Sequence, residues 1–186
     1  MNLIEELRRS EVIPAVKEES QLQRAVKSNA SVVFLLKSDL SSAKEMVDYC
    51  HSHGKKAFLH FDLTEGLSND EAAVKYAAEI IKPDGIISTK NNVIKVAKQY
   101  GMFCVFRVFL IDSHSVGVSL SNTIKNKADA VEILPGIIPD LVKTFREEAD
   151  AQVITGGLIN CRRHIDEAIN AGAICCSTSD EELWNF

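Results

Sequence analysis

This chain of 186 residues has no long apolar run, no excess of positive charge and no regular set of cysteines. A membrane-spanning helix needs about 20 consecutive apolar residues, and no segment here reaches that length, so we expect no membrane association. The opening segment MNLIEELRRSE is acidic and polar, which predicts no signal peptide and a cytoplasmic location. The net charge of −5 argues against a broadly basic nucleic-acid surface, although a local basic patch remains compatible with it.

Sequence motifs for metal, nucleotide and hydrolase chemistry are also missing. The five histidines show no HExxH spacing, and neither a Walker motif nor a G-x-S-x-G elbow occurs, so we expect no metal site. The five cysteines are odd in number and irregularly placed. Cys104, Cys175 and Cys176 lie in apolar runs, which predicts burial as small hydrophobic side chains. Cys161 follows Asn160 at a predicted helix start, where a thiol pKa can fall.

Short apolar runs do recur along the chain, at intervals of about 23 residues. Most of them are apolar on both faces, as is typical of buried parallel strands. The runs are VIPAV (12–16), VVFLL (32–36), AFLHF (57–61), GIIS (85–88), FCVFRVF (103–109), AVEIL (130–134), QVIT (152–155) and AICCS (173–177).

Helix-boundary patterns separate these runs. A serine followed three residues later by Glu or Gln predicts a capping box, and this pairing occurs at Ser20/Gln23, Ser42/Glu45, Ser68/Glu71 and Ser179/Glu182. Gly54, Gly101 and Gly172 each stand shortly before a strand, where a left-handed helix cap is expected.

Eight strand–helix units predict a compact (β/α)₈ TIM-type barrel that forms a single domain over residues 1–186. LIEELRRS (3–10) is an extra N-terminal helix, and we expect it to cover the barrel where the short last unit, DEELWNF, falls short. An open doubly wound sheet is the alternative. That fold favours a Gly-rich turn after the first strand, whereas AVKEES contains no glycine.

The chemistry of such a barrel lies at the C-terminal ends of its strands. Several of the predicted strands end in a basic residue, although the chain is acidic overall. In order, the residues at the strand ends are Lys17, Lys37, His60 with Asp62, Ser88 with Lys90, Arg107, Glu132, Gly156 with Gly157, and Ser177 with Thr178.

Arg107 is distinctive among these residues because apolar residues flank it on both sides. It alternates with Val105 and Phe109, which predicts that it points into the barrel mouth and needs an anion there. A ligand could supply that anion, and a structural ion pair with Glu132 is the alternative. If the anion is a ligand, loss of Arg107 should leave the unliganded protein equally or more stable, because a repelling charge is removed.

The remaining polar residues at the mouth have two interpretations as well. His60 and Asp62 share a face, so they could bond each other or a ligand hydroxyl. A His60 satisfied by a backbone carbonyl is the alternative. Each lysine could equally be a solvated loop residue.

The segments TGG (155–157) and STS (177–179) end the last two predicted strands. Barrels often bind phosphate in these two loops, at the N-termini of the helices that follow. Gly156, Gly157, Ser177 and Thr178 therefore predict a phosphate site, because glycine exposes backbone donors and the hydroxyls add more. Two tight turns without a ligand are the alternative.

The segments VIPAVK, FLL, HFDLTEGLSNDEAAVKY, PDGIISTK, VFRVFLIDS, VEILPG, TGGLI and GAICCSTSDEELWNF occur in this order along the chain. With them the chain resembles, over essentially its whole length, the glycerol-3-phosphate-responsive antiterminators, regulators of bacterial glycerol-uptake operons. IISTK, EILPG (Glu132–Gly136) and the closing STS…LWN are the most specific pieces.

This resemblance implies a barrel that binds glycerol 3-phosphate and then acts on leader mRNA, so that transcription passes a terminator. It implies an effector ligand, no cofactor and no catalysis. The ligand-binding residues are then Lys17, Lys37, His60, Asp62, Lys90, Arg107, Glu132 and Gly136, with the phosphate at Gly156, Gly157, Ser177 and Thr178.

The RNA-binding surface does not follow from the sequence. Arg162 and Arg163 are our candidates, with Lys55 and Lys56 as a weaker choice. The alternative function is a barrel enzyme of aldolase or isomerase type that acts on a small phosphorylated substrate. In that enzyme Lys37 or Lys90 would form a Schiff base, and Glu132 or Asp62 would be the general base.

Overall fold

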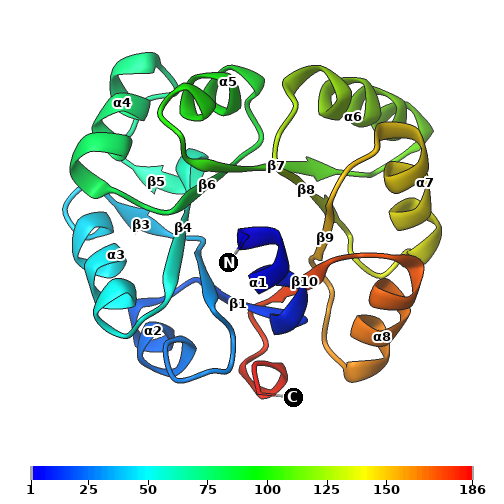
Figure 1. Cartoon of the computed structure of the whole chain (residues 1–186), viewed down its shortest axis with the longest axis horizontal. Coiled ribbons are helices and arrows are strands. Elements are labelled where there is room, and N and C mark those ends of the chain that lie inside the picture. Colours follow the sequence, from blue (N-terminus) through cyan, green and yellow to red (C-terminus); the bar gives the residue numbers. More distant parts are fainter. Residues whose placement is uncertain (1, 186) are drawn as a thin grey trace.

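The computed structural model describes residues 2–185 and contains a closed barrel of eight parallel strands (Figure 1). The strands follow the order β1-β10-β9-β8-β7-β6-β4-β2 around the barrel, so the predicted (β/α)₈ fold is confirmed and the open doubly wound sheet is wrong. Their bounds are β1 Val12–Val16, β2 Val32–Leu35, β4 Lys56–His60, β6 Gly85–Ser88, β7 Phe103–Phe109, β8 Ala130–Leu134, β9 Val153–Gly156 and β10 Cys175–Thr178.

Helices surround the barrel on its outside (Figure 1). They are α2 Glu19–Ala25, α3 Ala43–Ser52, α4 Glu71–Tyr76, α5 Asn91–Gln99, α6 Ser113–Asn126, α7 Pro139–Ala149 and α8 Arg162–Ala171. A π-helical turn, η2 (Ala77–Ile81), continues α4, and a 3₁₀ turn, η3 (Glu181–Leu183), follows β10. Within residues 2–185, none of the helices combines the length and apolar character that a membrane span requires.

The N-terminal helix α1 (Leu3–Ser10) lies in the centre of the barrel in Figure 1. Leu7 is fully buried in the same cluster as Ile13, Val32 and Ile174, which lie near the N-terminal ends of their strands. The helix therefore closes the N-terminal opening of the barrel, and the expectation that it covers the short last unit is wrong. An open end of the barrel would expose apolar interior, and the amphipathic α1 buries it.

Residues of the short last unit, rather than α1, cover the outside of β10. Trp184 is buried, and its Nε1 donates a hydrogen bond of 2.9 Å to the carbonyl oxygen of Thr178 at the end of β10. The turn η3 packs against α2 and takes the place of an eighth outer helix.

Alternation along the strands separates two apolar layers. Phe58 points into the barrel, where its ring stacks on that of Phe34 with centroids 5.6 Å apart. Leu59 points outward to the helices, and His60 points inward again. Inside the barrel, this alternation places aliphatic and aromatic side chains toward the N-terminal ends of the strands and polar side chains toward the C-terminal ends.

The helix caps differ in part from the predicted ones. Gly54, Gly101 and Gly172 have φ of +69°, +73° and +105°, as expected of left-handed caps. The predicted capping boxes are wrong. Ser42 is an N-cap residue without a side-chain cap bond, and Glu18, Asp70 and Asp180 cap the helices expected to begin at Ser20, Ser68 and Ser179. Nearby carboxylates take these positions because they accept N–H bonds more strongly than a hydroxyl.

A small parallel sheet stands beside the barrel mouth and was not predicted. It pairs β3 (Ser38–Asp39) with β5 (Thr64–Glu65). The Ser38 and Thr64 hydroxyls lie 3.1 Å apart, and Thr64 also donates to the carbonyl oxygen of His60. The Ser38–Thr64 bond ties the segment after β4 to the segment after β2, and the Thr64–His60 bond holds Thr64 at the end of β4.

Candidate functional site

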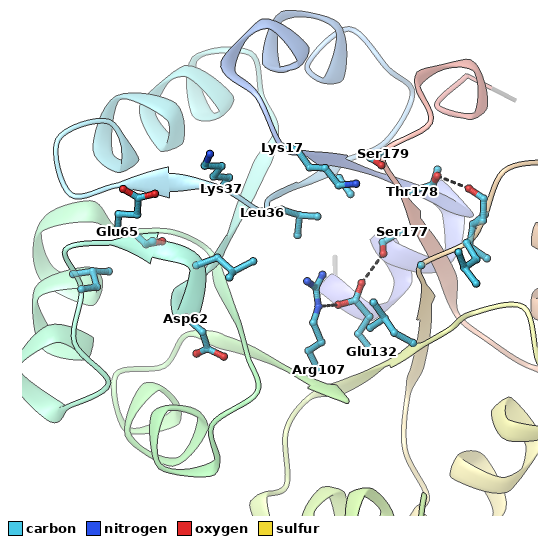
Figure 2. Close-up of a pocket in the computed structure, with 18 of the residues that line it drawn as sticks. Lys17, Leu36, Lys37, Asp62, Glu65, Arg107, Glu132, Ser177, Thr178 and Ser179 are labelled. Carbon is cyan, nitrogen blue, oxygen red and sulfur yellow. Dashed lines mark hydrogen bonds and ion pairs between the residues drawn. The ribbon is translucent and has the colours of Figure 1, made fainter. Parts of the chain in front are cut away.

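A cavity of about 750 Å³ opens at the C-terminal ends of the strands (Figure 2). Its wall combines residues from the ends of β1, β2, β4, β7 and β8 with the loops after β9 and β10. Among the predicted ligand-binding residues, those that line the cavity are Lys17, Lys37, Asp62, Arg107, Glu132, Gly157, Ser177 and Thr178. His60, Lys90, Gly136 and Gly156 lie outside this lining.

Arg107, Glu132 and Ser177 form a hydrogen-bonded chain on the floor of the cavity (Figure 2). Arg107 Nε donates to Glu132 Oε2 at 2.5 Å, and the Ser177 hydroxyl donates to Glu132 Oε1 at 2.5 Å. Arg107 is 6% exposed and Glu132 is fully buried. Arg107 and Glu132 are direct neighbours in the β7–β8 register, so the ion pair considered from the sequence is present. Because Arg107 also lines the cavity, its guanidinium faces both Glu132 and any ligand.

Two glycines make room for this chain. A Cβ on Gly156 would lie 2.6 Å from Glu132 Oε1 and 2.7 Å from Ser177 Oγ. A Cβ on Gly136 would lie 2.7 Å from the backbone nitrogen of Gly156. Gly156 and Gly136 therefore allow the close packing that holds the polar floor in place.

His60 is buried in the layer of the floor, with 3% of its surface exposed. Burial lowers the pKa of His60 to about 4, and the charge of Arg107 acts in the same direction against the opposing effects of Asp62 and Glu132. The imidazole is therefore neutral at pH 7. Its Nδ1 is buried and has no hydrogen-bond partner among the described residues.

Asp62 holds the ends of two strands together. Its carboxylate accepts bonds from the Ser88 hydroxyl at 2.5 Å, the Thr89 N–H at 2.6 Å and the Thr89 hydroxyl at 2.7 Å. These three bonds join the segment after β4 to the end of β6. Thr89 was not among the predicted site residues, although it follows Ser88 directly in the IISTK motif.

The three predicted lysines, Lys17, Lys37 and Lys90, are exposed, and two of them line the cavity. Figure 2 shows the Lys17 side chain reaching over the cavity, whereas Lys37 points outward. Lys90 is the N-cap residue of α5 and lies away from the cavity.

The loops after β9 and β10 close one side of the cavity. Gly157 has φ of +74°, and its carbonyl oxygen accepts a bond of 3.1 Å from the Gly136 N–H. The Thr178 hydroxyl donates to the carbonyl oxygen of Ile159 at 2.8 Å and accepts from the Asp180 N–H at 3.1 Å. The hydroxyl protons of Ser177 and Thr178 therefore go to protein acceptors.

Sequence reasoning missed the apolar part of the wall. Leu63 and Leu67, on the segment between β4 and α4, line the cavity together with Leu36 and Leu158. Apolar and polar residues alternate at the start of FDLTEGL (61–67), and this was the available indication. The segment is too short for the alternation to predict which side chains face a cavity.

The basic residues considered for RNA are largely paired. Arg162 donates to Asp166 at 2.7 Å and to Glu11 at 3.0 Å, whereas Arg163 is more exposed and lies 3.9 Å from Glu167. Lys55 donates to the carbonyl oxygens of Ser28 and Ala30.

Comparison with known proteins assigns the family. The family model described as glycerol-3-phosphate responsive antiterminator matches residues 12–184. An uncharacterized protein of Escherichia coli (strain K12), YgcP, is 35% identical over 186 residues, which is all of this chain and 97% of that protein.

Solved structures agree with this assignment. A glycerol uptake operon antiterminator regulatory protein from Listeria monocytogenes is 36% identical, with a TM-score of 0.91 over 94% of both chains. A glycerol uptake operon antiterminator-related protein from Thermotoga maritima is 30% identical, with a TM-score of 0.84 over 94% of this chain and 98% of that one. A deoxyribose phosphate aldolase from Aeropyrum pernix is 15% identical, with a TM-score of 0.70 over 98% of this chain and 94% of that one, and this likeness shows the barrel fold alone. The chain belongs to the glycerol-3-phosphate responsive antiterminator family.

Proposed function

We propose that this protein is a cytoplasmic transcription antiterminator that binds glycerol 3-phosphate in the cavity at the strand ends. In the liganded form it binds the leader mRNA of glycerol-uptake genes, and it performs no catalysis. The observation that carries the proposal is the buried Arg107 on the cavity floor, which faces the cavity in a protein of this family.

The cavity has the two kinds of group that a phosphorylated polyol needs. Arg107 and Lys17 supply positive charge, and the loops after β9 and β10 lead into α8 and η3. Because the Ser177 and Thr178 hydroxyls donate to protein acceptors, we assign the phosphate to backbone N–H groups of these loops, beginning at Gly157. Oxygens of Glu132 and the Ser177 hydroxyl lie on the floor as partners for the glycerol hydroxyls.

Titration calorimetry with glycerol 3-phosphate and with glycerol tests the ligand. We expect binding of the phosphate ester and none of glycerol, because the charged groups recognise the phosphate. Equal affinity for the two compounds would contradict the assignment.

Titration of leader RNA with and without glycerol 3-phosphate tests the regulatory role. Linkage requires that a ligand which strengthens RNA binding is itself bound more tightly in the presence of RNA. RNA affinity that is independent of the ligand would contradict the regulatory role.

The enzyme alternative receives less support from the site. A Schiff-base lysine is usually activated by desolvation, whereas Lys37 and Lys90 are exposed and Lys90 lies away from the cavity. Borohydride reduction with candidate sugar phosphates discriminates the two functions, since a trapped lysine adduct would establish the enzyme.

A further inference from the structure

The cavity is larger than the proposed effector requires. Glycerol 3-phosphate has about ten non-hydrogen atoms, which at roughly 30 Å³ each, the share of a water molecule in the liquid, occupy about 300 Å³ at most. The cavity measures about 750 Å³. More than half of this space lies beyond a bound glycerol phosphate.

The two sides of the cavity differ in chemistry. Ser177, Thr178 and Ser179 lie on one side in Figure 2, next to Arg107 and Glu132. The segment that carries Asp62 and Glu65 lies on the other side, with Leu36 between the two sides. A phosphate held by the loops after β9 and β10 therefore directs the far end of the glycerol toward the segment 62–67.

This far side carries aliphatic surface that the protein itself leaves uncovered. Leu63 is 50% exposed and lines the cavity, Leu67 lines it from the same segment, and Leu36 lies between the two sides (Figure 2). The Asp62 carboxylate, which lines the cavity, already accepts three bonds, and the other charged groups on the far side are the exposed Lys37 and Glu65 at the rim. Uncovered aliphatic side chains in a cavity favour an apolar ligand group.

We propose that the far side is a subsite for a short aliphatic group, so that the cavity takes glycerol 3-phosphate substituted on the oxygen of its far carbon. This inference rests on the proposed binding of glycerol 3-phosphate and defines the ligand class more closely. The substituent covers Leu36, Leu63 and Leu67 while the phosphate keeps its place beside Gly157.

A series of 1-O-alkyl ethers of glycerol 3-phosphate with methyl, butyl and hexyl groups tests the subsite by calorimetry. Each methylene that becomes fully buried raises affinity about fourfold, equivalent to about 0.8 kcal/mol. We expect the hexyl ether to bind at least tenfold more tightly than the methyl ether, and the hexyl ether of glycerol without phosphate not to bind. Affinity that stays constant or falls along the series would overturn the subsite.

A hexitol phosphate tests whether size alone is recognised, because it fills similar space with hydroxyl groups. Tighter binding of the hexitol phosphate than of the hexyl ether would overturn the apolar assignment. Vesicles that contain a long-chain alkyl glycerol phosphate distinguish a membrane lipid from a free ligand. Binding to the vesicles together with failure to bind the soluble ethers would also overturn the proposal.

Variants of Leu63 link the effect to the proposed residue. Leu63→Ser should lower affinity for the hexyl ether at least threefold and leave affinity for glycerol 3-phosphate within twofold, and Leu63→Met should retain both. Ile80→Ser is the matched control, because Ile80 is 48% exposed and lies on η2, away from the cavity. Equal effects of Leu63→Ser and Ile80→Ser would overturn the role of Leu63.

The experiments separate failure of this inference from failure of the proposed function. If glycerol 3-phosphate binds and the hexyl ether binds no better, the subsite is wrong and the proposed effector stands. If the hexyl ether binds and glycerol 3-phosphate does not, the subsite stands and the proposed effector is wrong. If neither compound binds, both proposals are wrong.

Discussion

A fully buried carboxylate sits at the centre of the candidate site. Burial of Glu132 without partners would be costly, and Arg107 and Ser177 provide one bond to each of its oxygens. Gly156 leaves the space that this arrangement occupies. The polar floor is therefore a structural unit whether or not a ligand is bound.

From the sequence, with a ligand as the anion, we expected loss of Arg107 to leave the unliganded protein equally or more stable. The ion pair with Glu132 leads to the opposite expectation, a loss of stability. Arg107→Met leaves the Glu132 carboxylate buried without its positive partner, so we expect a loss of about 3–5 kcal/mol in unfolding free energy in urea. The double variant Arg107→Met/Glu132→Gln should recover much of this loss, because the buried charge is removed as well. Affinity for glycerol 3-phosphate should fall more than tenfold in both variants. Unchanged stability of the single variant would contradict the ion pair.

The lowered pKa of His60 predicts how the stability of the fold changes with pH. Its pKa is lowered to about 4 in the folded protein, mainly by burial, and is about 6.5 when unfolded. The unfolded state therefore binds a proton as the pH falls from about 6.5 to 4 while the folded state does not, so stability decreases in this window by up to about 3 kcal/mol. Urea unfolding at several pH values should show a flatter profile for His60→Gln across this range. Parallel profiles for the two proteins would contradict the lowered pKa.

The loop between β9 and α8 has a left-handed backbone conformation and lines the cavity. Gly157 has φ of +74°, a region that side chains with a Cβ rarely adopt, and Leu158 after it has φ of +62°. Two consecutive left-handed residues turn the chain sharply at the end of β9. The turn brings Gly157 to the cavity wall.

Gly157→Val should abolish binding of glycerol 3-phosphate, because the side chain covers the backbone assigned to the phosphate. It should also destabilise the fold by about 1–2 kcal/mol through the left-handed conformation. Gly54→Val is the control, since Gly54 has φ of +69° and an added Cβ there meets no atom within 4 Å. We expect a comparable stability loss and normal binding for Gly54→Val, measured by unfolding and calorimetry. Retained binding in Gly157→Val would remove the phosphate from this loop.

The whole molecule is a barrel with one closed and one open end. Helix α1 closes the N-terminal end through Leu7, so small molecules reach the interior from the end where Arg107 and Glu132 lie. The net charge of −5 repels RNA, so any RNA contact must come from a local group of basic residues. Arg163 is the second residue of α8, in the first turn after the loop that carries Gly157.

Arg163→Ala tests this surface by filter binding to leader RNA across a range of salt concentrations. Loss of one phosphate contact should weaken RNA binding and reduce the salt slope by about one, with affinity for glycerol 3-phosphate unchanged. Arg24→Ala is the matched control, because the Arg24 and Arg163 side chains are both 75% exposed and each lies beside a glutamate. Equal effects of the two changes would exclude a specific patch on α8.

Apolar periodicity was enough to predict the barrel, the inward direction of Arg107 and the polar layer at the strand ends. Strands that are apolar on both faces belong to a parallel sheet covered on both sides, and eight strand–helix units without a Gly-rich first turn favour the closed barrel over the open doubly wound sheet. The glycines before the strands could also be interpreted from the sequence, because a left-handed cap favours glycine, whereas the left-handed caps at Lys82, Lys127 and Asp150 could not.

The hydrogen-bond partners depended on tertiary structure. Glu132 pairs with Arg107 because the β7–β8 register places the two side by side, and Asp62 bonds Ser88 and Thr89 because β4 lies beside β6. The place of α1 and the apolar wall at Leu63 were likewise decided by packing between distant segments. Periodicity reports which side of an element is buried, but the choice of partner depends on atoms that only the folded chain brings within hydrogen-bond or van der Waals distance.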